Sequence, residues 1–266
     1  MLPQLILIER LRQLCEQDQR LTAAMLYGSF TTGEGDAFSD IECLLYFDDT
    51  MLPQIDRAGW VAQIAPLALF FADDFGHYTA IFESLIRGEF HFKPASSIGD
   101  VTGWQGNVWF PSLAATLLVD RLGLLAPHLQ PFIGKPPPQD SAQMVERLIN
   151  NFINSALFGS NTLARGELAR SLEILGMQHR YLLWMARLVE CKTDHWATPS
   201  RAAEKDLSPD TYARLKSCTA ALDEAQLQSA YQAAWNWGIE MLRVLAERHQ
   251  LALPDVLIAV ISDKIN

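Results

Sequence analysis

The chain has 266 residues, 49% of them hydrophobic and 20% charged, a composition typical of a globular protein with one large domain or two of ordinary size. Its formal net charge of −10 argues against a polynucleotide partner, because binding a phosphate backbone needs clustered Lys and Arg. The N-terminus lacks the features of a secretory signal, and the longest apolar run, residues 61–72, is too short for a bilayer. We therefore expect a soluble, cytoplasmic protein that binds neither nucleic acid nor a membrane.

The first half of the chain mixes helical and strand-like patterns. Apolar residues at helical spacing open the sequence, and two short apolar runs on either side of a glycine-containing loop have the character of buried strands. Residues 94–111 are expected to be irregular, and residues 112–125 to form a strand or a short helix. The other predicted elements are a helix over residues 4–17, strands over 21–27 and 41–47, a helix from 60 followed by a strand over 67–71, and strands over 78–82 and 89–92.

A proline-rich stretch, residues 134–138, is the clearest linker, since three consecutive prolines fit neither inside a helix nor in a central strand. After it, apolar residues recur every three or four positions, which predicts a helical bundle. The expected helices cover residues 141–164, 166–191, 208–220 and 223–249, with a last one from Pro254. We predict an α+β fold, with a mixed sheet and flanking helices in a catalytic domain over residues 1–134 and a helical C-terminal domain over residues 140–266.

A glycine turn and a pair of carboxylates carry the chemistry of the first half. Gly28 and Ser29 lie where the first predicted strand ends, in a turn that lets the backbone approach an anion closely. Asp40 and Glu42 stand two apart at the second strand, so they point to the same face. Two carboxylates without cationic partners repel one another, and Mg²⁺ relieves that repulsion and brings triphosphate oxygens with it. Either feature alone is more typical of an ordinary turn or a solvated strand start. Together, in this order and with strand patterns on both sides, they favour a site for a metal and a nucleotide.

Glu89 is a candidate third carboxylate. In the predicted strand it shares a face with His91, whereas Phe90 and Phe92 point to the opposite face. An acid on a neighbouring strand could complete a metal site or accept a proton from an attacking hydroxyl. A surface Glu on an edge strand is the alternative, and His91 by itself is more typical of a structural polar residue than of a catalyst.

Motif stretches occur in both halves: residues 27–31 (Tyr-Gly-Ser-Phe-Thr), 33–36 (Gly-Glu-Gly-Asp), 39–42 (Ser-Asp-Ile-Glu), 86–92 (Ile-Arg-Gly-Glu-Phe-His-Phe) and 165–173 (Arg-Gly-Glu-Leu-Ala-Arg-Ser-Leu-Glu). Together they resemble the lincosamide nucleotidyltransferases, antibiotic-modifying enzymes of the nucleotidyltransferase superfamily. The Gly-Ser and Asp-x-Glu parts are shared by the whole superfamily. The last two stretches are the more discriminating ones.

The resemblance implies transfer of a nucleoside monophosphate from an NTP to a hydroxyl of lincomycin or clindamycin, with release of pyrophosphate. It implies that Asp40 and Glu42 hold Mg²⁺, with two ions at the site, and that Glu89 is a metal ligand, the general base, or both. The turn of Gly28 and Ser29 would contact the triphosphate. Glu42 departs from the wider superfamily, in which Asp is commoner, and this leaves its coordination mode open.

Arg170 is a candidate phosphate ligand in the helical half. It shares a helix face with Glu167, and this face could line a cleft between the halves, although a solvated face with local ion pairs is the alternative. The helical domain would cap the cleft and contribute an acceptor site or a homodimer interface. Further candidates are Arg87 and Lys93 for phosphate, and Trp104 and Trp109 as walls of an acceptor pocket, for which core packing is the alternative.

Two rival functions follow from the same residues. An aminoglycoside nucleotidyltransferase would share the metal site and also act on an amine-bearing drug, so the acidic charge does not separate it from a lincosamide enzyme. A non-catalytic nucleotidyltransferase-like regulatory or antitoxin protein is the second rival. Such proteins are often small, single-domain chains, so the long helical half speaks against it.

Overall fold

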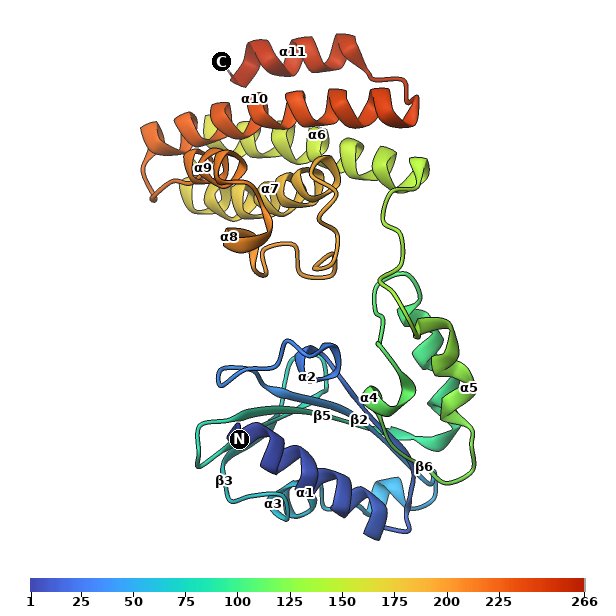
Figure 1. Cartoon of the computed structure of the whole chain (residues 1–266). Coiled ribbons are helices and arrows are strands. Elements are labelled where there is room, and N and C mark those ends of the chain that lie inside the picture. Colours follow the sequence, from blue (N-terminus) through green and yellow to red (C-terminus); the bar gives the residue numbers. More distant parts are fainter. Residues whose placement is uncertain (266) are drawn as a thin grey trace. The chain divides into compact units, whose positions relative to one another are not determined.

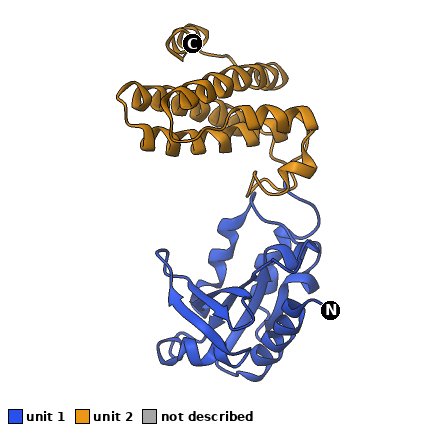
Figure 2. Cartoon of the chain, turned by 90° about the vertical axis from the view of Figure 1, so that its left-hand side faces the viewer, with its two compact units in different colours: residues 1–137 blue, residues 138–266 orange. Residues whose placement is uncertain are grey.

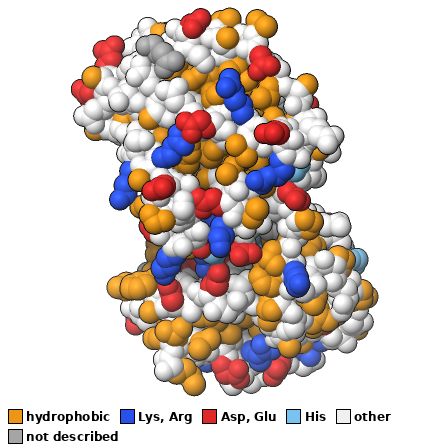
Figure 3. Space-filling model, turned by 45° about the horizontal axis from the view of Figure 1, so that its top comes forward, with side chains coloured by type: hydrophobic (Ala, Val, Ile, Leu, Met, Phe, Trp, Pro, Cys, Tyr) orange, Lys and Arg blue, Asp and Glu red, His pale blue; other side chains and the backbone are white. Residues whose placement is uncertain are grey.

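The computed structural model describes residues 1–265 (Figure 1) and divides into two compact units, Met1–Pro137 and Pro138–Asn266 (Figure 2). The division falls inside the proline-rich stretch of residues 134–138. On the face that Figure 3 shows, basic side chains alternate with acidic ones rather than forming one continuous basic area. None of the described helices is both long and apolar enough to cross a bilayer.

A six-stranded mixed sheet forms the centre of the N-terminal unit. Its strands are β1 (Leu21–Tyr27), β2 (Ile41–Phe47), β3 (Leu67–Ala72), β4 (Tyr78–Phe82), β5 (Arg87–Pro94) and β6 (Leu117–Asp120), in the spatial order β3-β4-β5-β2-β1-β6. All neighbouring strands are antiparallel except β2 and β5, which run parallel. The starts of β2 and β5 and the end of β1 therefore meet at one edge of the sheet.

Hydrophobic side chains cover both faces of this sheet. Helices α1 (Pro3–Gln17) and α3 (Arg57–Ala62) pack on one face, as Figure 1 shows. The opposite face packs against the 3-10 helix η2 (Ala95–Trp104) and α5 (Leu125–Leu129) through the strand residues Ala23, Met25, Leu44 and Tyr46. Short segments complete the unit: α2 (Ser29–Thr32), η1 (Leu52–Gln54), α4 (Leu113–Thr116) and η3 (Gln130–Phe132).

Strand alternation decides where the polar residues of the sheet go. Successive side chains point to opposite faces, so Tyr27 follows Met25 on the face that η2 and α5 cover, and Glu42 precedes Leu44 on the same face. Phe90 belongs to the opposite core, with α1 and α3. The polar positions of β1, β2 and β5 therefore gather on one face, where its apolar cover ends.

The C-terminal unit is helical throughout its regular elements. Its described helices are α6 (Ala142–Ala164), α7 (Leu168–Val189), α8 (Ala203–Asp206), α9 (Pro209–Ser217), α10 (Glu224–His249) and α11 (Asp255–Ile265). Helices α6, α7 and α10 lie side by side and bury one hydrophobic core, in which Phe152 stacks on Trp235 with ring centroids 5.8 Å apart. Ser141 caps α6 by accepting a hydrogen bond from the Met144 amide.

Arg187, a fully buried side chain of α7, holds the long connection that follows this helix. Its guanidinium donates hydrogen bonds to the carbonyl oxygens of Lys192, Pro199 and Arg201 at 3.0, 2.8 and 2.6 Å. It also forms an ion pair with Asp206 at 2.9 Å. A segment without periodic structure thus obtains a fixed course from one charged side chain.

The structure confirms the predicted α+β fold, and the strands over residues 21–27, 41–47 and 78–82 begin and end where they are predicted. Residues 94–111, predicted to be irregular, contain η2, whose two buried residues, Ile98 and Val101, are too few to show a helical period among its glycines and polar residues. Helix α8 was not predicted either, because its four residues are too few to show helical periodicity.

Candidate active site

Gly28 directly follows β1 and precedes the short helix α2. Its φ of +76° and ψ of −158° lie in a region that only glycine adopts without strain. A Cβ atom at this position would also lie 1.8 Å from Oε2 of Glu42. Both the backbone conformation and the space beside it therefore require glycine. Ser29, the next residue, is 7% exposed, so little of its surface reaches solvent.

Glu42 and Glu89 are register partners on the parallel strands β2 and β5. Glu42 is also the partner of Tyr27 on β1. Directly paired residues carry their side chains on the same face of a sheet and as neighbours. Asp40 lies one residue before β2, at the same edge. The structure thus brings the three predicted carboxylates to neighbouring positions, and all three are half-buried.

Arg87, the first residue of β5, pairs with two of these carboxylates. Its Nη1 contacts Asp40 Oδ2, and its Nη2 lies 3.0 Å from Glu89 Oε2. Asp40 therefore has a cationic partner in this structure, because Arg87 shares the strand face of Glu89 and reaches the start of β2. The Arg87 side chain is 44% exposed, so a phosphate group in solvent can also reach the guanidinium.

A hydrogen-bond network holds the other oxygen of Glu89. The Tyr27 hydroxyl donates to Glu89 Oε1 at 3.0 Å, and His91 Nε2 lies 2.8 Å from the same oxygen and 2.6 Å from the Tyr27 hydroxyl. Trp104 of η2 packs edge-on against the Tyr27 ring, with centroids 5.3 Å apart. Trp104 therefore borders this network and also packs against the core on this face, and its role as a wall of an acceptor pocket stays a prediction.

Burial and hydrogen bonding act in opposite directions on Glu89. Burial alone raises the pKa of this carboxyl, but the hydrogen bonds from His91, Arg87 and Tyr27 outweigh burial and hold the pKa below its usual value. Burial, and next the charge of Glu89, raise the pKa of the Tyr27 hydroxyl well above its ordinary range. Burial lowers the pKa of His91 despite the adjacent carboxylate. At neutral pH Glu89 is therefore ionised and Tyr27 is a hydrogen-bond donor.

The three carboxylates fit a hard divalent cation by donor type, since Mg²⁺ prefers oxygen ligands. Their oxygens are not drawn into one tight group, however, while Arg87 pairs with Asp40 and Glu89. Among residues 1–265, the group of His, Cys, Asp or Glu side chains whose ligand atoms all lie within 4.8 Å of one another is His77, Glu89 and His91. The three predicted ligands are thus neighbours, and the positive charge beside them is that of Arg87.

Sequence reasoning missed two members of this site, Tyr27 and His77. Tyr27 carries a usable signal, because it continues the strand alternation of Met25 and stands directly before the glycine turn. His77 carries none, because it lies in the turn before β4 and approaches Glu89 only through the pairing of β4 with β5. Of the remaining candidates, Lys93 lies on β5 opposite Tyr46, and Trp109 is half-buried.

Arg170 belongs to α7 of the C-terminal unit and keeps local partners. Its Nη1 lies 3.2 Å from Glu167 Oε2, and its guanidinium lies 5.2 Å from the centre of the Phe158 ring. The side chain is 53% exposed. This is the local ion pair on a solvated helix face that was the alternative expectation, and the phosphate-binding role of Arg170 stays a prediction.

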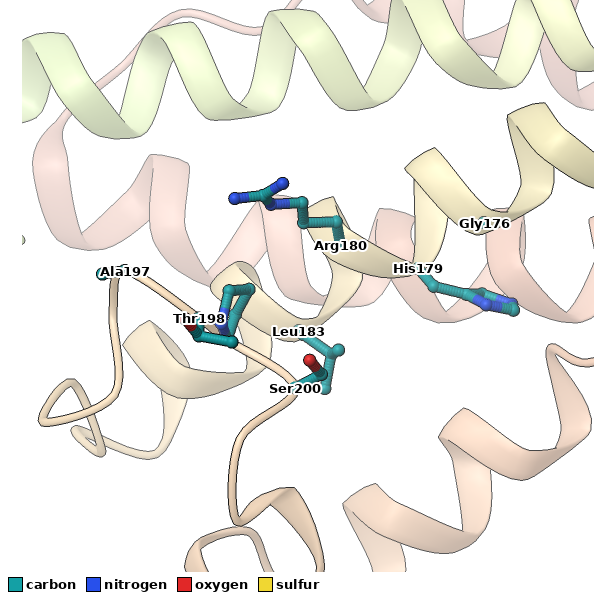
Figure 4. Close-up of a pocket in the computed structure, with 8 residues that line it drawn as sticks. Gly176, His179, Arg180, Leu183, Ala197, Thr198 and Ser200 are labelled. Carbon is teal, nitrogen blue, oxygen red and sulfur yellow. The ribbon is translucent and has the colours of Figure 1, made fainter. Parts of the chain in front are cut away.

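A cavity of about 490 Å³ opens in the C-terminal unit between α7 and the segment of residues 197–200 (Figure 4). His179, Arg180 and Leu183 of α7 line it, with Thr198 and Ser200 opposite. His179 also lies against the Cys218 carbonyl oxygen, with its Nε2 at 2.5 Å. Arg180 places a positive charge at the border of this cavity.

Residues 141–263 match a family model described as the C-terminal domain of lincosamide nucleotidyltransferase-like proteins. The match spans most of the C-terminal unit and less than half of the chain. No curated protein matches the chain. The C-terminal unit is thus similar to the C-terminal domain of lincosamide nucleotidyltransferase-like proteins.

Two solved structures resemble the whole chain weakly. An aminoglycoside 6-adenyltransferase from Bacillus subtilis is 13% identical, with 98% of this chain and 95% of that chain covered and a TM-score of 0.46. A nucleotidyltransferase-like protein from Exiguobacterium sibiricum 255-15 is 13% identical, with 95% of this chain and 84% of that chain covered and a TM-score of 0.37. At these TM-scores neither likeness carries an argument about function.

Proposed function

We propose that this protein transfers a nucleoside monophosphate from an NTP to a hydroxyl of a lincosamide such as lincomycin or clindamycin, with release of pyrophosphate. The observation that carries the proposal is the pairing of Glu42 with Glu89 across β2 and β5, beside Asp40 and the Gly28 turn. The family match of residues 141–263 supports a lincosamide as the acceptor. The net charge of −10 is compatible with a drug that carries an amine.

Asp40, Glu42 and Glu89 are the residues that would hold Mg²⁺, as a pair of ions. Bound there, Mg²⁺ supplies positive charge to the triphosphate and to the attacking and leaving oxygens. In the proposal, Arg87 leaves Asp40 and Glu89 and pairs with a phosphate, which its exposed guanidinium allows. The turn of Gly28 and Ser29 contacts the triphosphate through backbone N–H groups, because no Cβ stands in the way at Gly28.

Glu89 accepts the proton of the acceptor hydroxyl as that oxygen attacks the α-phosphorus. The depressed pKa of Glu89 keeps it ionised, and therefore able to accept a proton, at neutral pH. Tyr27 remains protonated and donates to Oε1, which fixes the direction of the carboxylate. Transfer of this kind depends on positioning and charge neutralisation more than on covalent chemistry, and these side chains supply both.

The proposal is tested by the mass of the drug after incubation. Purified protein with Mg²⁺ and ATP, GTP, CTP or UTP, offered one at a time, receives lincomycin, clindamycin or kanamycin, and pyrophosphate release is measured in parallel. We expect a lincosamide to gain the mass of one nucleoside monophosphate. Modification of kanamycin alone would make the protein an aminoglycoside enzyme, and no pyrophosphate with any acceptor would favour a non-catalytic protein.

A further inference from the structure

The group formed by His77, Glu89 and His91 has a donor set of its own. Two imidazoles and one carboxylate are ligands that Zn²⁺ and similar divalent transition metals prefer, whereas Mg²⁺ prefers oxygen ligands alone. We propose that His77, Glu89 and His91 form a site for Zn²⁺ that is separate in its chemistry from the Mg²⁺ site and shares only Glu89 with it.

The pairing of β4 with β5 places the three ligands together. Tyr78 is the partner of Phe90, and one step further along these antiparallel strands brings His77 opposite His91. Glu89 lies two residues before His91 and so shares its face. The three ligands therefore lie on one face of the β4–β5 hairpin, and a one-residue shift of the register between these strands would separate them.

The distances suit a tetrahedral ion. His91 Nε2 lies 2.8 Å from Glu89 Oε1, and His77 Nδ1 lies 3.9 Å from the same oxygen. Ligand atoms around tetrahedral Zn²⁺ lie roughly 3.3 Å apart, since the bonds are about 2.0–2.1 Å long. The observed distances bracket that value. The ligand atoms of His77, Glu89 and His91 all lie within 4.8 Å of one another, so side-chain movements can bring them to one ion.

His77 contacts the rings of Phe75 and His91, and its Nδ1 faces two carboxylates. The two carboxylate oxygens that face its Nδ1, from Asp73 and Glu89, each lie 3.9 Å away, which is beyond hydrogen-bond distance. Asp73 Oδ1 accepts hydrogen bonds from the amides of Phe75 and His77, which fixes the turn that presents the imidazole. His91 can offer Nε2 as a lone pair when its single proton is on Nδ1. Three protein ligands leave one position for water.

Zinc at this site would impair Glu89 as the general base of the transfer reaction. Glu89 Oε1 faces His77 and His91, whereas Oε2 faces Arg87. A carboxylate bonded through Oε1 to Zn²⁺ is a weaker base at Oε2, because the cation stabilises its negative charge. Zn²⁺ would therefore inhibit the transfer reaction, a consequence that rests on the proposed function, whereas the binding itself does not.

The test measures metal binding apart from turnover. The whole protein, without nucleotide or drug, is titrated with Zn²⁺ by calorimetry and with Co²⁺ by visible absorption, in the presence of millimolar Mg²⁺. We expect one Zn²⁺ per chain and the intense visible bands of tetrahedral Co²⁺. The His77→Gln variant should bind Zn²⁺ more than about tenfold more weakly and lose these bands. His128→Gln, a histidine of α5 outside the group, is the matched control and should change neither.

Equal Zn²⁺ affinity of the wild type and His77→Gln would overturn the proposal, as would the absence of Zn²⁺ binding to the wild type. In the turnover assay, with each protein compared with its own zinc-free rate, Zn²⁺ should inhibit the wild type and inhibit His77→Gln less, because His77 binds the ion. If no drug is modified at all, the proposed function fails while the binding result stands. If drugs are modified but zinc does not bind, only the zinc site fails.

Discussion

Gly28 lies so close to Glu42 that a Cβ atom at position 28 would be 1.8 Å from the carboxylate oxygen Oε2. We predict that Gly28→Ala displaces Glu42 and also strains the backbone, whose φ is +76°. The free energy of unfolding should fall by about 1–3 kcal/mol from the backbone strain, and turnover should fall more steeply than stability. Urea unfolding and initial rates on the same preparation measure the two effects.

Gly33 offers a matched control for this substitution. Its φ is +82°, but an added Cβ would meet no atom within 4 Å. Gly33→Ala should therefore cost about 1–2 kcal/mol of backbone strain and leave turnover near normal. Equal losses of turnover in the two variants would show that the Glu42 contact has no special part in the site.

Asp40→Asn tests the metal assignment. The amide keeps the shape of the side chain and removes the charge that a divalent cation needs. Losing even a residue that supports a metal ligand costs roughly 10–100-fold in activity, so we predict that loss of the ligand itself lowers turnover by more than about 100-fold. The fold should persist, because Asp40 is half-buried and its partner Arg87 retains Glu89. Circular dichroism and pyrophosphate release are the measurements, and near-normal turnover at any Mg²⁺ concentration would refute the assignment.

Glu89→Gln separates a general base from a binding residue. Removing a base should lower kcat by roughly 10²–10⁴-fold and change KM for the drug little. The side-chain amide of this variant would still accept from Tyr27 through its carbonyl oxygen, whereas its NH2 group would lose the ion pair with Arg87. Steady-state kinetics with varied drug at saturating NTP gives both constants. A large rise in KM with kcat preserved would instead assign Glu89 to acceptor binding.

The sequence predicts those parts of the site in which strand alternation alone decides the face to which a side chain points. Glu89 and His91 share a face, as their spacing predicts, and Phe90 lies in the core on the other side. Contacts that depend on which strands are neighbours were not predictable. His77 meets Glu89 because β4 pairs with β5, and Arg87 meets Asp40 because β5 runs parallel to β2. A single sequence contains the periodicity of each strand but not the order of strands in the sheet.

Arg187→Met should destabilise the C-terminal unit strongly. Arg187 is fully buried and pairs with Asp206 while holding three carbonyl groups, so the variant leaves buried acceptors without their donor. Breaking a fully buried pair costs about 3–5 kcal/mol, and we expect the lower end here because Asp206 is 24% exposed and keeps its contact with His195. Arg180→Met, on the same helix but exposed, is the matched control and should change the urea midpoint little. Similar midpoints for both variants would mean that the connection after α7 does not depend on Arg187.

Asp18→Asn should remove a pH-dependent part of the stability. Hydrogen bonds from Arg20 are the largest influence that lowers the pKa of Asp18, and Trp60 Nε1 also donates to this carboxylate at 2.9 Å. Because the pKa in the folded state lies below the ordinary value of 3.8, the stabilisation is fully present above that pH and is lost as the pH falls through the lowered value. The variant should therefore be less stable than the wild type at pH 7 by about 1–2 kcal/mol. This figure is modest because Arg20 is 41% exposed. The difference in stability should shrink below about pH 4. Urea unfolding between pH 7 and about pH 3 measures this difference, with Asp74→Asn, a change at an exposed carboxylate, as the control. A difference in stability that stays constant with pH would show that Asp18 stabilises the fold by its shape and not by its charge.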